Sequence, residues 1–121
     1  MTRFREIQLY ETDAGKAPVA EFIETIRVQA VRARIIKVFE MVEQLPIPPS
    51  NFLKKLAGSG DIWEVRAVTS HQSFRFLGFY DGRLLILTNA FPKKADKTPL
   101  QEIALAKRRK EMYFSGQREL L

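Results

Sequence analysis

The sequence predicts one α+β domain over residues 1–121, with the element order β-α-α-β-β-β-α. Three observations predict it. The first half contains two segments with the apolar period of helices, the second half contains three runs with strand character, and an Asp-Gly pair joins two of these runs. We expect an antiparallel sheet with a helical hairpin on one face and a C-terminal helix, and the other sheet face partly open.

The first half begins with a strand and continues with two helices. Residues 3–10 alternate between two faces, one of them apolar, as a half-buried strand does. Pro18 fits the first position of a helix, where its missing N–H is not needed. Apolar residues follow at the spacing i, i+3, i+4, i+7: Val19, Phe22, Ile23 and Ile26. A second amphipathic helix is expected at about residues 30–45, and prolines from Pro46 onward end it.

The second half contains the three consecutive strands, at residues 62–68, 73–80 and 83–91. Asp81-Gly82 is a hairpin turn between the last two, so the three form a meander that the opening strand joins. Alternation then places six apolar residues under the helices: Trp63, Val65, Phe74, Phe76, Leu84 and Ile86. Tyr80 falls on this same face and is expected in the core.

The last helix has its own start signals. Thr98 is predicted as the N-cap, Pro99 as the first helical residue and Gln101 as the partner in a capping box. We expect this helix to end at about Tyr113 and residues 114–121 to form a flexible tail.

Composition narrows the class of protein. The chain has no cysteine, which excludes disulfides and a thiol nucleophile and is typical of a reducing, cytoplasmic location. The start lacks the apolar run of a signal peptide, and no segment is apolar enough to span a membrane. Residues 1–50 hold seven Lys/Arg and seven Asp/Glu, whereas residues 51–121 hold thirteen against seven. The whole net charge of +6 therefore lies in the second half, which favours a surface that faces a polyanion such as nucleic acid.

Glu64, Arg66 and Arg75 share the predicted open face of the sheet. Two interpretations fit them. They could form a cross-strand cluster of ion pairs, or the two guanidiniums could clamp a phosphate bidentately. The spacing alone does not choose between these.

One basic segment precedes the last helix, and another lies in its final turns. Lys93, Lys94 and Lys97 precede its N-terminus, where free backbone N–H groups favour an anion, although solvated lysines are also common in loops. Residues 107–110, Lys-Arg-Arg-Lys, complement the helix dipole near the other end and also provide for electrostatic docking to RNA.

His71 is the only histidine, in a turn where a solvated residue is the default. Its ordinary pKa suits a general base, but one histidine cannot form a two-histidine acid–base pair or a histidine-based metal site. The carboxylates are too scattered for a two-metal nuclease, so no metal and no cofactor is expected.

These motifs together resemble the phage-derived, HigB-like branch of the RelE/ParE toxin superfamily. The resemblance covers residues 53–110 in order and rests on these segments: Leu53-Lys-Lys-Leu56, Ile62-Trp-Glu-Val-Arg66, Phe74-Arg75-Phe76, Tyr80-Asp-Gly-Arg83, Phe91-Pro-Lys-Lys-Ala-Asp-Lys-Thr-Pro99 and the helix at Ala106–Arg109. The ordered set is specific to the family, whereas each segment alone is weak.

The resemblance implies a RelE-like fold and the toxin of a type II toxin–antitoxin pair. Such toxins cut mRNA on the ribosome without a metal: the 2′-hydroxyl attacks its own 3′-phosphate and leaves a 2′,3′-cyclic phosphate, which inhibits translation. The matched positions imply a catalytic set of Arg66, Arg75, Lys94, Lys97 and Tyr113. They also imply an RNA-binding set of Lys54, Lys55, Lys93, Lys107, Arg108 and Arg109.

The implied partners are a helix-turn-helix antitoxin and mRNA in the A site of the 70S ribosome, next to 16S rRNA. Operator DNA would be bound only through the antitoxin, and no membrane is involved. Two alternatives remain. A ParE-like toxin has the same fold and inhibits gyrase, and a phage accessory protein would bind nucleic acid without catalysis.

Overall fold

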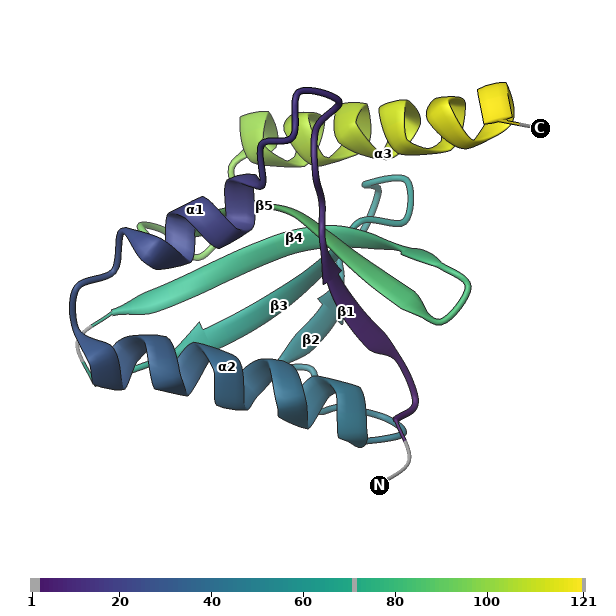
Figure 1. Ribbon diagram of the computed structural model, residues 1–121. Helices are drawn as coiled ribbons and strands as arrows, with labels where there is room; N and C mark the ends of the chain where they lie inside the picture. The colour runs from purple at the N-terminus through teal and green to yellow at the C-terminus, as the bar shows by residue number, and fades with distance from the viewer. Residues whose placement is uncertain (1–2, 71, 121) are drawn as a thin grey trace.

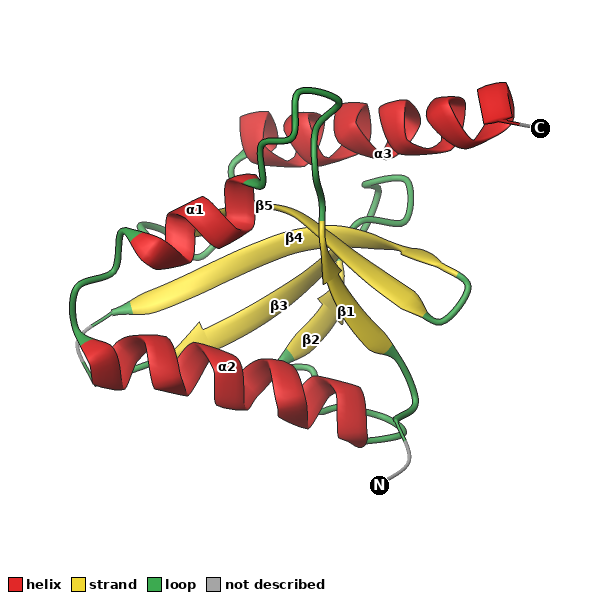
Figure 2. Ribbon diagram, viewed as in Figure 1, coloured by secondary structure: helices red, strands yellow, loops and turns green. Residues whose placement is uncertain are grey.

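The computed structural model describes the backbone of residues 3–70 and 72–120 and the side chains of residues 3–70 and 72–116. Within these ranges the chain forms five strands and three helices (Figure 2). In chain order they are β1 (Glu6–Leu9), α1 (Pro18–Glu24), α2 (Gln29–Gln44), β2 (Leu53–Lys55), β3 (Trp63–Val68), β4 (Ser73–Asp81), β5 (Leu84–Pro92) and α3 (Leu100–Leu120). The predicted α+β class is confirmed, and β2 is a short strand that the sequence did not predict.

The strands form one sheet in the order β1-β5-β4-β3-β2 (Figure 1). The predicted meander is confirmed, since β3, β4 and β5 pair antiparallel in sequence order. Gly82 of the turn between β4 and β5 has φ of 60°, which glycine adopts without strain. The opening strand joins the sheet as expected, by pairing parallel with β5.

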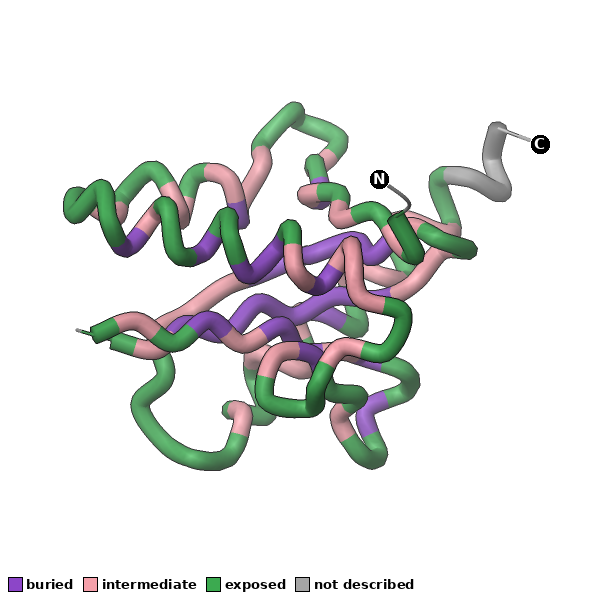
Figure 3. Tube along the Cα trace, turned by 90° about the horizontal axis from the view of Figure 1, so that it is seen from below, coloured by how far each residue is buried: buried purple, intermediate pink, exposed green. Residues whose placement is uncertain are grey.

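Helices α1 and α2 cover one face of the sheet and build the larger core there (Figure 3). Phe39 of α2 packs edge-on against Phe76 of β4, with ring centroids 5.0 Å apart. The predicted placement of Val65, Phe74 and Phe76 in this core is confirmed. Tyr80 also packs there, with its ring centroid 5.3 Å from that of Trp63.

Two residues predicted for this core, Leu84 and Ile86, lie on the other sheet face instead. Leu85 and Leu87 occupy the core beneath the helices. Residues 84–87 are all apolar, so the sequence pattern does not show which of them face the helices. The pairing of Tyr80 in β4 with Leu85 in β5 determines that Leu85 and Leu87 do.

Helix α3 packs on β4 and β5 and so covers part of the second sheet face (Figure 1). The buried residues there form a second cluster: Tyr10, Ile62, Leu77, Phe79, Ile86 and Ala106. Helix α3 also continues to Leu120, beyond the predicted end near Tyr113. Phe114, which we expected in the flexible tail, packs with its ring centroid 5.4 Å from that of Phe79.

A register shift divides the β4–β5 ladder at Leu77 and Gly78. Leu77 faces Asn89 and Gly78 faces Leu87, so Thr88 is an extra residue in β5. The Thr88 hydroxyl lies 3.2 Å from the carbonyl oxygen of Leu77 and 2.6 Å from the amide oxygen of Asn89. This irregularity sets the orientation of Asn89, which reaches α3.

No helix in the described part of the chain is both long enough and apolar enough to cross a membrane.

Candidate functional site

Glu64, Arg66 and Arg75 meet on one sheet face, as the sequence predicts. Arg66 of β3 lies directly opposite Arg75 of β4. Arg66 Nε donates a hydrogen bond to Glu64 Oε1 at 2.6 Å, and Arg75 Nη1 lies 3.8 Å from Glu64 Oε2. One carboxylate thus holds two guanidiniums side by side, with one positive charge in excess.

The cluster is buried rather than open, because the chain entering α3 covers it. Glu64 is fully buried and Arg75 is 4% exposed, whereas the Arg66 side chain keeps 29% of its surface accessible. Thr98 closes the cluster: its hydroxyl donates to Glu64 Oε2 at 2.6 Å and accepts from Arg75 Nη1 at 3.3 Å. The Thr98 side chain therefore bonds this cluster and not the helix backbone, which corrects the predicted capping box. Both oxygens of Glu64 are occupied, so Glu64 is a structural anion.

Two hollows open on either side of Arg75. The Arg66 hollow holds about 140 Å³ and the Lys94 hollow about 200 Å³. The first is lined by Asn51, Arg66, Val68, Ser73, Phe74, Arg75 and Lys93. The second is lined by Arg75, Phe91, Pro92, Lys93, Lys94, Ala95, Pro99, Gln101 and Glu102. Arg75 and Lys93 belong to both, so the two hollows form one continuous cationic surface.

The loop that contains Lys93, Lys94 and Lys97 lies at this surface, but the three lysines have different surroundings. Lys93 borders both hollows, with its backbone N–H bonded to the Ser73 carbonyl at 2.8 Å and its ammonium 3.5 Å from Asp96. Lys94 borders the second hollow. Lys97 is exposed and borders neither. Among the described residues lining the hollows, four cations therefore face one carboxylate, Glu102.

The sequence pattern does not identify Glu102 or the residues that hold it in place. Asn89 Nδ2 donates to Glu102 Oε1 at 2.9 Å and to the Glu102 carbonyl at 3.2 Å. The Thr88 hydroxyl donates to Asn89 Oδ1, and Arg109 Nη1 donates to the Thr88 carbonyl at 2.6 Å. The only hint in the sequence is a glutamate in the first turn of a helix, which is common for dipole reasons.

Lys54 and Lys55 lie on opposite faces of β2. Lys54 is paired with Glu64 across the β2–β3 ladder and so shares the face of the cluster. Lys55 turns away, and its ammonium lies 2.7 Å from Asp61 Oδ1. That hydrogen bond and charge hold the pKa of the Asp61 carboxyl below its ordinary value. Only Lys54 of this pair is brought near the candidate site.

The four basic residues at positions 107–110 of α3 also differ in their contacts. Arg109 bonds the Thr88 carbonyl, and Lys110 Nζ bonds the Gly60 carbonyl at 3.0 Å. Lys107 runs along Gly60, whereas Arg108 is exposed. Arg109 and Lys110 thus have structural partners, which leaves Arg108 and Lys107 as the more accessible cations of the predicted RNA-binding set.

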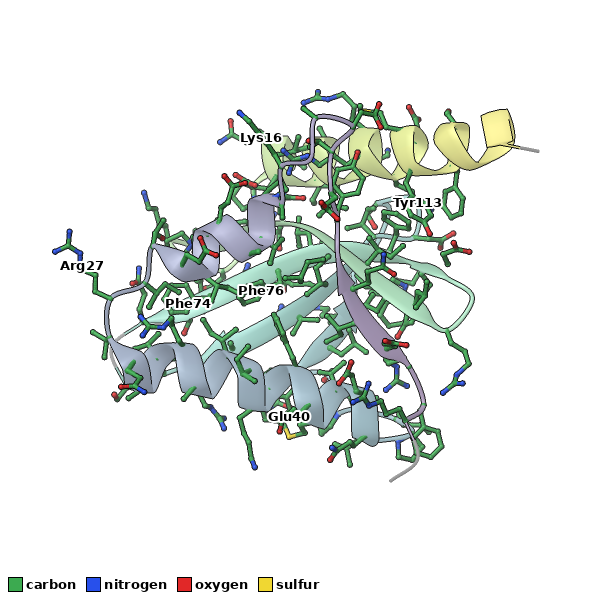
Figure 4. All side chains as sticks on the ribbon, in the orientation of Figure 1. Lys16, Arg27, Glu40, Phe74, Phe76 and Tyr113 are labelled. Atoms are coloured by element: carbon green, nitrogen blue, oxygen red, sulfur yellow. The ribbon has the colours of Figure 1, made fainter. Side chains whose placement is uncertain are left out.

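The structure does not bring Tyr113 together with the arginines. Its hydroxyl donates to Asp81 Oδ2 at 2.7 Å, and its ring packs on Phe79. Asp81 is six residues along β4 from Arg75, roughly 20 Å at the usual rise of a strand. Figure 4 shows Tyr113 at the opposite end of the sheet from Phe74, the neighbour of Arg75. The predicted base candidate His71 lies outside the described residues.

Comparison with known proteins assigns the chain to a family. The sequence profile of phage-derived protein Gp49-like (DUF891) matches residues 21–111. This range holds α2, the whole cluster and both hollows, and it excludes β1 and the last turns of α3. The family is linked to toxins of toxin–antitoxin systems. No curated protein matches the chain. Within the described residues, no three His, Cys, Asp or Glu side chains group as a metal site would require.

Proposed function

Since the chain belongs to the Gp49-like family of phage-derived proteins, which is linked to toxin–antitoxin toxins, we propose that it is such a toxin and that it cleaves mRNA on the ribosome. The observation that carries the proposal is the pair of hollows around Arg75, where four cations face one carboxylate. A surface of this kind suits the phosphates of a nucleic-acid chain. An antitoxin is the expected protein partner, since the family is linked to such pairs.

In the proposed reaction, the 2′-hydroxyl of one nucleotide attacks the phosphorus of its own 3′-phosphate. Negative charge then builds on the phosphorane oxygens, so fixed cations stabilise the transition state more than the ground state. In this proposal the role falls to Arg75 and Lys93, which border both hollows, and to Arg66, which borders one of them. Burial of Arg75 against Glu64 and Thr98 holds its guanidinium in one orientation before RNA binds.

Five other predicted cations lie beside these groups and would contact RNA, whereas Lys55 and Arg109 are engaged within the protein. Lys94 borders the second hollow, and Lys97 follows it in the same exposed loop. Lys54 lies beside the cluster on β2, and Lys107 and Arg108 continue the basic surface along α3. Contacts of this kind position a backbone without selecting a base.

The test uses Arg66→Ala, because Arg66 is the accessible arginine of the cluster. Removing it leaves Glu64 with Arg75 and Thr98, so the fold is expected to remain within about 1 kcal/mol of wild type. Cleavage is expected to slow about 100-fold, as when one oxyanion donor is removed. The measurement is primer extension on a defined mRNA in an in vitro translation reaction.

The matched control is Arg27→Ala, an exposed arginine between α1 and α2 that points away from the molecule (Figure 4). This variant should cut mRNA at the wild-type rate. If Arg66→Ala also keeps the wild-type rate, the cluster is not the reaction site. Intact mRNA with poisoned gyrase would favour a gyrase-directed toxin, and neither effect would leave a nucleic-acid-binding protein without catalysis.

A further inference from the structure

The Lys94 hollow contains a carboxylate that the proposed reaction has not used. Glu102 is half-buried in the first turn of α3 and borders this hollow together with Arg75, Lys93 and Lys94. Two other carboxylates are near. Glu64 has both oxygens occupied by Arg66, Arg75 and Thr98, and Asp96 is exposed beside Lys93 and does not line the hollow. Among the described residues, Glu102 is therefore the carboxylate that lines this hollow.

Among the described residues, one carboxylate oxygen of Glu102 accepts a side-chain hydrogen bond and the other does not. Oε1 accepts the 2.9 Å hydrogen bond from Asn89 Nδ2. Among residues 3–70 and 72–116, Oε2 has no hydrogen-bond partner, and no buried side-chain oxygen in these ranges lacks one. Oε2 must therefore be accessible to solvent. Oε1 thus holds the carboxylate in place, and Oε2 is the exposed oxygen of a residue that lines the hollow.

The residues that hold Glu102 in place are themselves fixed by hydrogen bonds and by burial. The Thr88 hydroxyl donates to Asn89 Oδ1 at 2.6 Å, which orients the amide so that its NH₂ group faces Glu102. Asn89 is 4% exposed and Thr88 is fully buried, and both are placed by the register shift between β4 and β5. A catalytic base needs this kind of preorganised orientation more than it needs strong basicity alone.

We infer that Glu102 is the general base of the reaction, taking the proton of the attacking 2′-hydroxyl on Oε2, and that Asn89 is its positioning residue. The inference rests on the proposed ribonuclease function. The hollow holds about 200 Å³ and places Glu102 beside cations that attract the phosphate next to that hydroxyl.

The 2′-O–H bond breaks, its proton moves to Glu102 Oε2, and the oxygen electron pair forms the 2′-O–P bond. The P–O5′ bond breaks, and the leaving 5′-oxygen takes a proton from the ammonium group of Lys94, which borders the same hollow. The products are a 2′,3′-cyclic phosphate and a 5′-hydroxyl, and solvent then reprotonates Lys94 and deprotonates Glu102.

The variant that tests the inference is Glu102→Gln, because Gln keeps the shape and can still accept from Asn89 through its side-chain oxygen. Single-turnover cleavage of mRNA on programmed ribosomes is measured from pH 4.0 to 8.5, a range that includes the ordinary pKa of a glutamate side chain, about 4.3. We expect wild type to lose activity at the acidic end as Glu102 is protonated. The Gln variant should be about 100-fold slower at neutral pH and should lack this acidic limb. Affinity for mRNA with a 2′-deoxy substitution at the cut site should change less than threefold.

Two further variants separate catalysis from structure. Glu102→Asp should recover part of the rate together with the acidic limb. Asn89→Asp places a second carboxylate against Glu102 and should move the acidic limb to higher pH. The control is Glu111→Gln, which removes the same charge from an exposed position of α3 and should leave rate and profile unchanged.

The outcomes are distinct. If wild type cuts RNA and Glu102→Gln retains its rate and its acidic limb, Glu102 is not the base, and the ribonuclease function stands. If wild type itself leaves mRNA intact, the inference and the proposed function fail together. A slow Glu102→Gln variant whose acidic limb remains would also overturn the inference, since it points to a structural role.

Discussion

Replacing Glu64 by Gln is expected to lower the free energy of unfolding by about 3 kcal/mol. Glu64 is fully buried, and its carboxylate lies against Arg66, Arg75 and Thr98. Gln has almost the same shape but no charge, so the Arg75 guanidinium would stay buried without an anion. Removing one partner of a buried ion pair is costly because the remaining charge has lost its hydration and its counter-charge.

Urea unfolding of the purified proteins at pH 7 measures this effect. Glu111→Gln is again the matched control, because it removes an exposed carboxylate, and it should change stability by less than about 0.5 kcal/mol. If Glu64→Gln unfolds at the wild-type urea concentration, the Arg75 guanidinium has enough hydration on its own. The cluster would then not be the rigid, buried frame that we describe.

Gly78→Ala is expected to cost about 3 kcal/mol or more, or to prevent folding. A Cβ atom at Gly78 would lie 2.1 Å from the Ile86 carbonyl oxygen and 2.9 Å from its carbonyl carbon. Both are backbone atoms of β5, so no side chain can move aside. The strands would have to separate at the register shift that also places Thr88 and Asn89.

Thermal unfolding followed by circular dichroism tests this prediction. Gly116→Ala, in α3, makes the same change where, among the described residues, no atom outside the adjoining helix backbone lies within 4 Å of the new methyl group. It should leave stability unchanged or raise it by up to about 1 kcal/mol, because alanine favours a helix. Equal melting temperatures for Gly78→Ala and wild type would show that β4 and β5 are not as close as described.

Much of the fold is predictable because local patterns determine it. The helical stripes at Val19–Ile26 and Val31–Leu45, the Asp81-Gly82 turn and the prolines after α2 act within a few residues. The phase of β5 is not predictable in this way, because residues 84–87 are apolar on both faces. The cover that α3 gives to the second face depends on packing between distant segments, such as Phe114 on Phe79.

The candidate site, too, is predictable where local patterns determine it and not where distant segments meet. Arg66 and Arg75 could be placed on one face because strand alternation is regular through both residues. The sequence context of Thr98 predicts a helix cap, because it does not reveal that Glu64 and Arg75 approach the hydroxyl from the sheet. Glu102 and Asn89 could not be paired at all, since their contact requires the extra residue at Thr88.

The central claim is that this chain cuts mRNA through a 2′-hydroxyl attack at the Arg66 and Lys94 hollows. The chemical groups at the ends of the cut RNA test this claim most directly. Wild-type protein is added to translating ribosomes, and the fragments are analysed for their terminal groups. We expect fragments with a 2′,3′-cyclic phosphate on one side of the cut and a 5′-hydroxyl on the other, and none when the cut nucleotide carries 2′-deoxyribose. Fragments with 5′-phosphate ends, or mRNA that stays intact, would contradict the account.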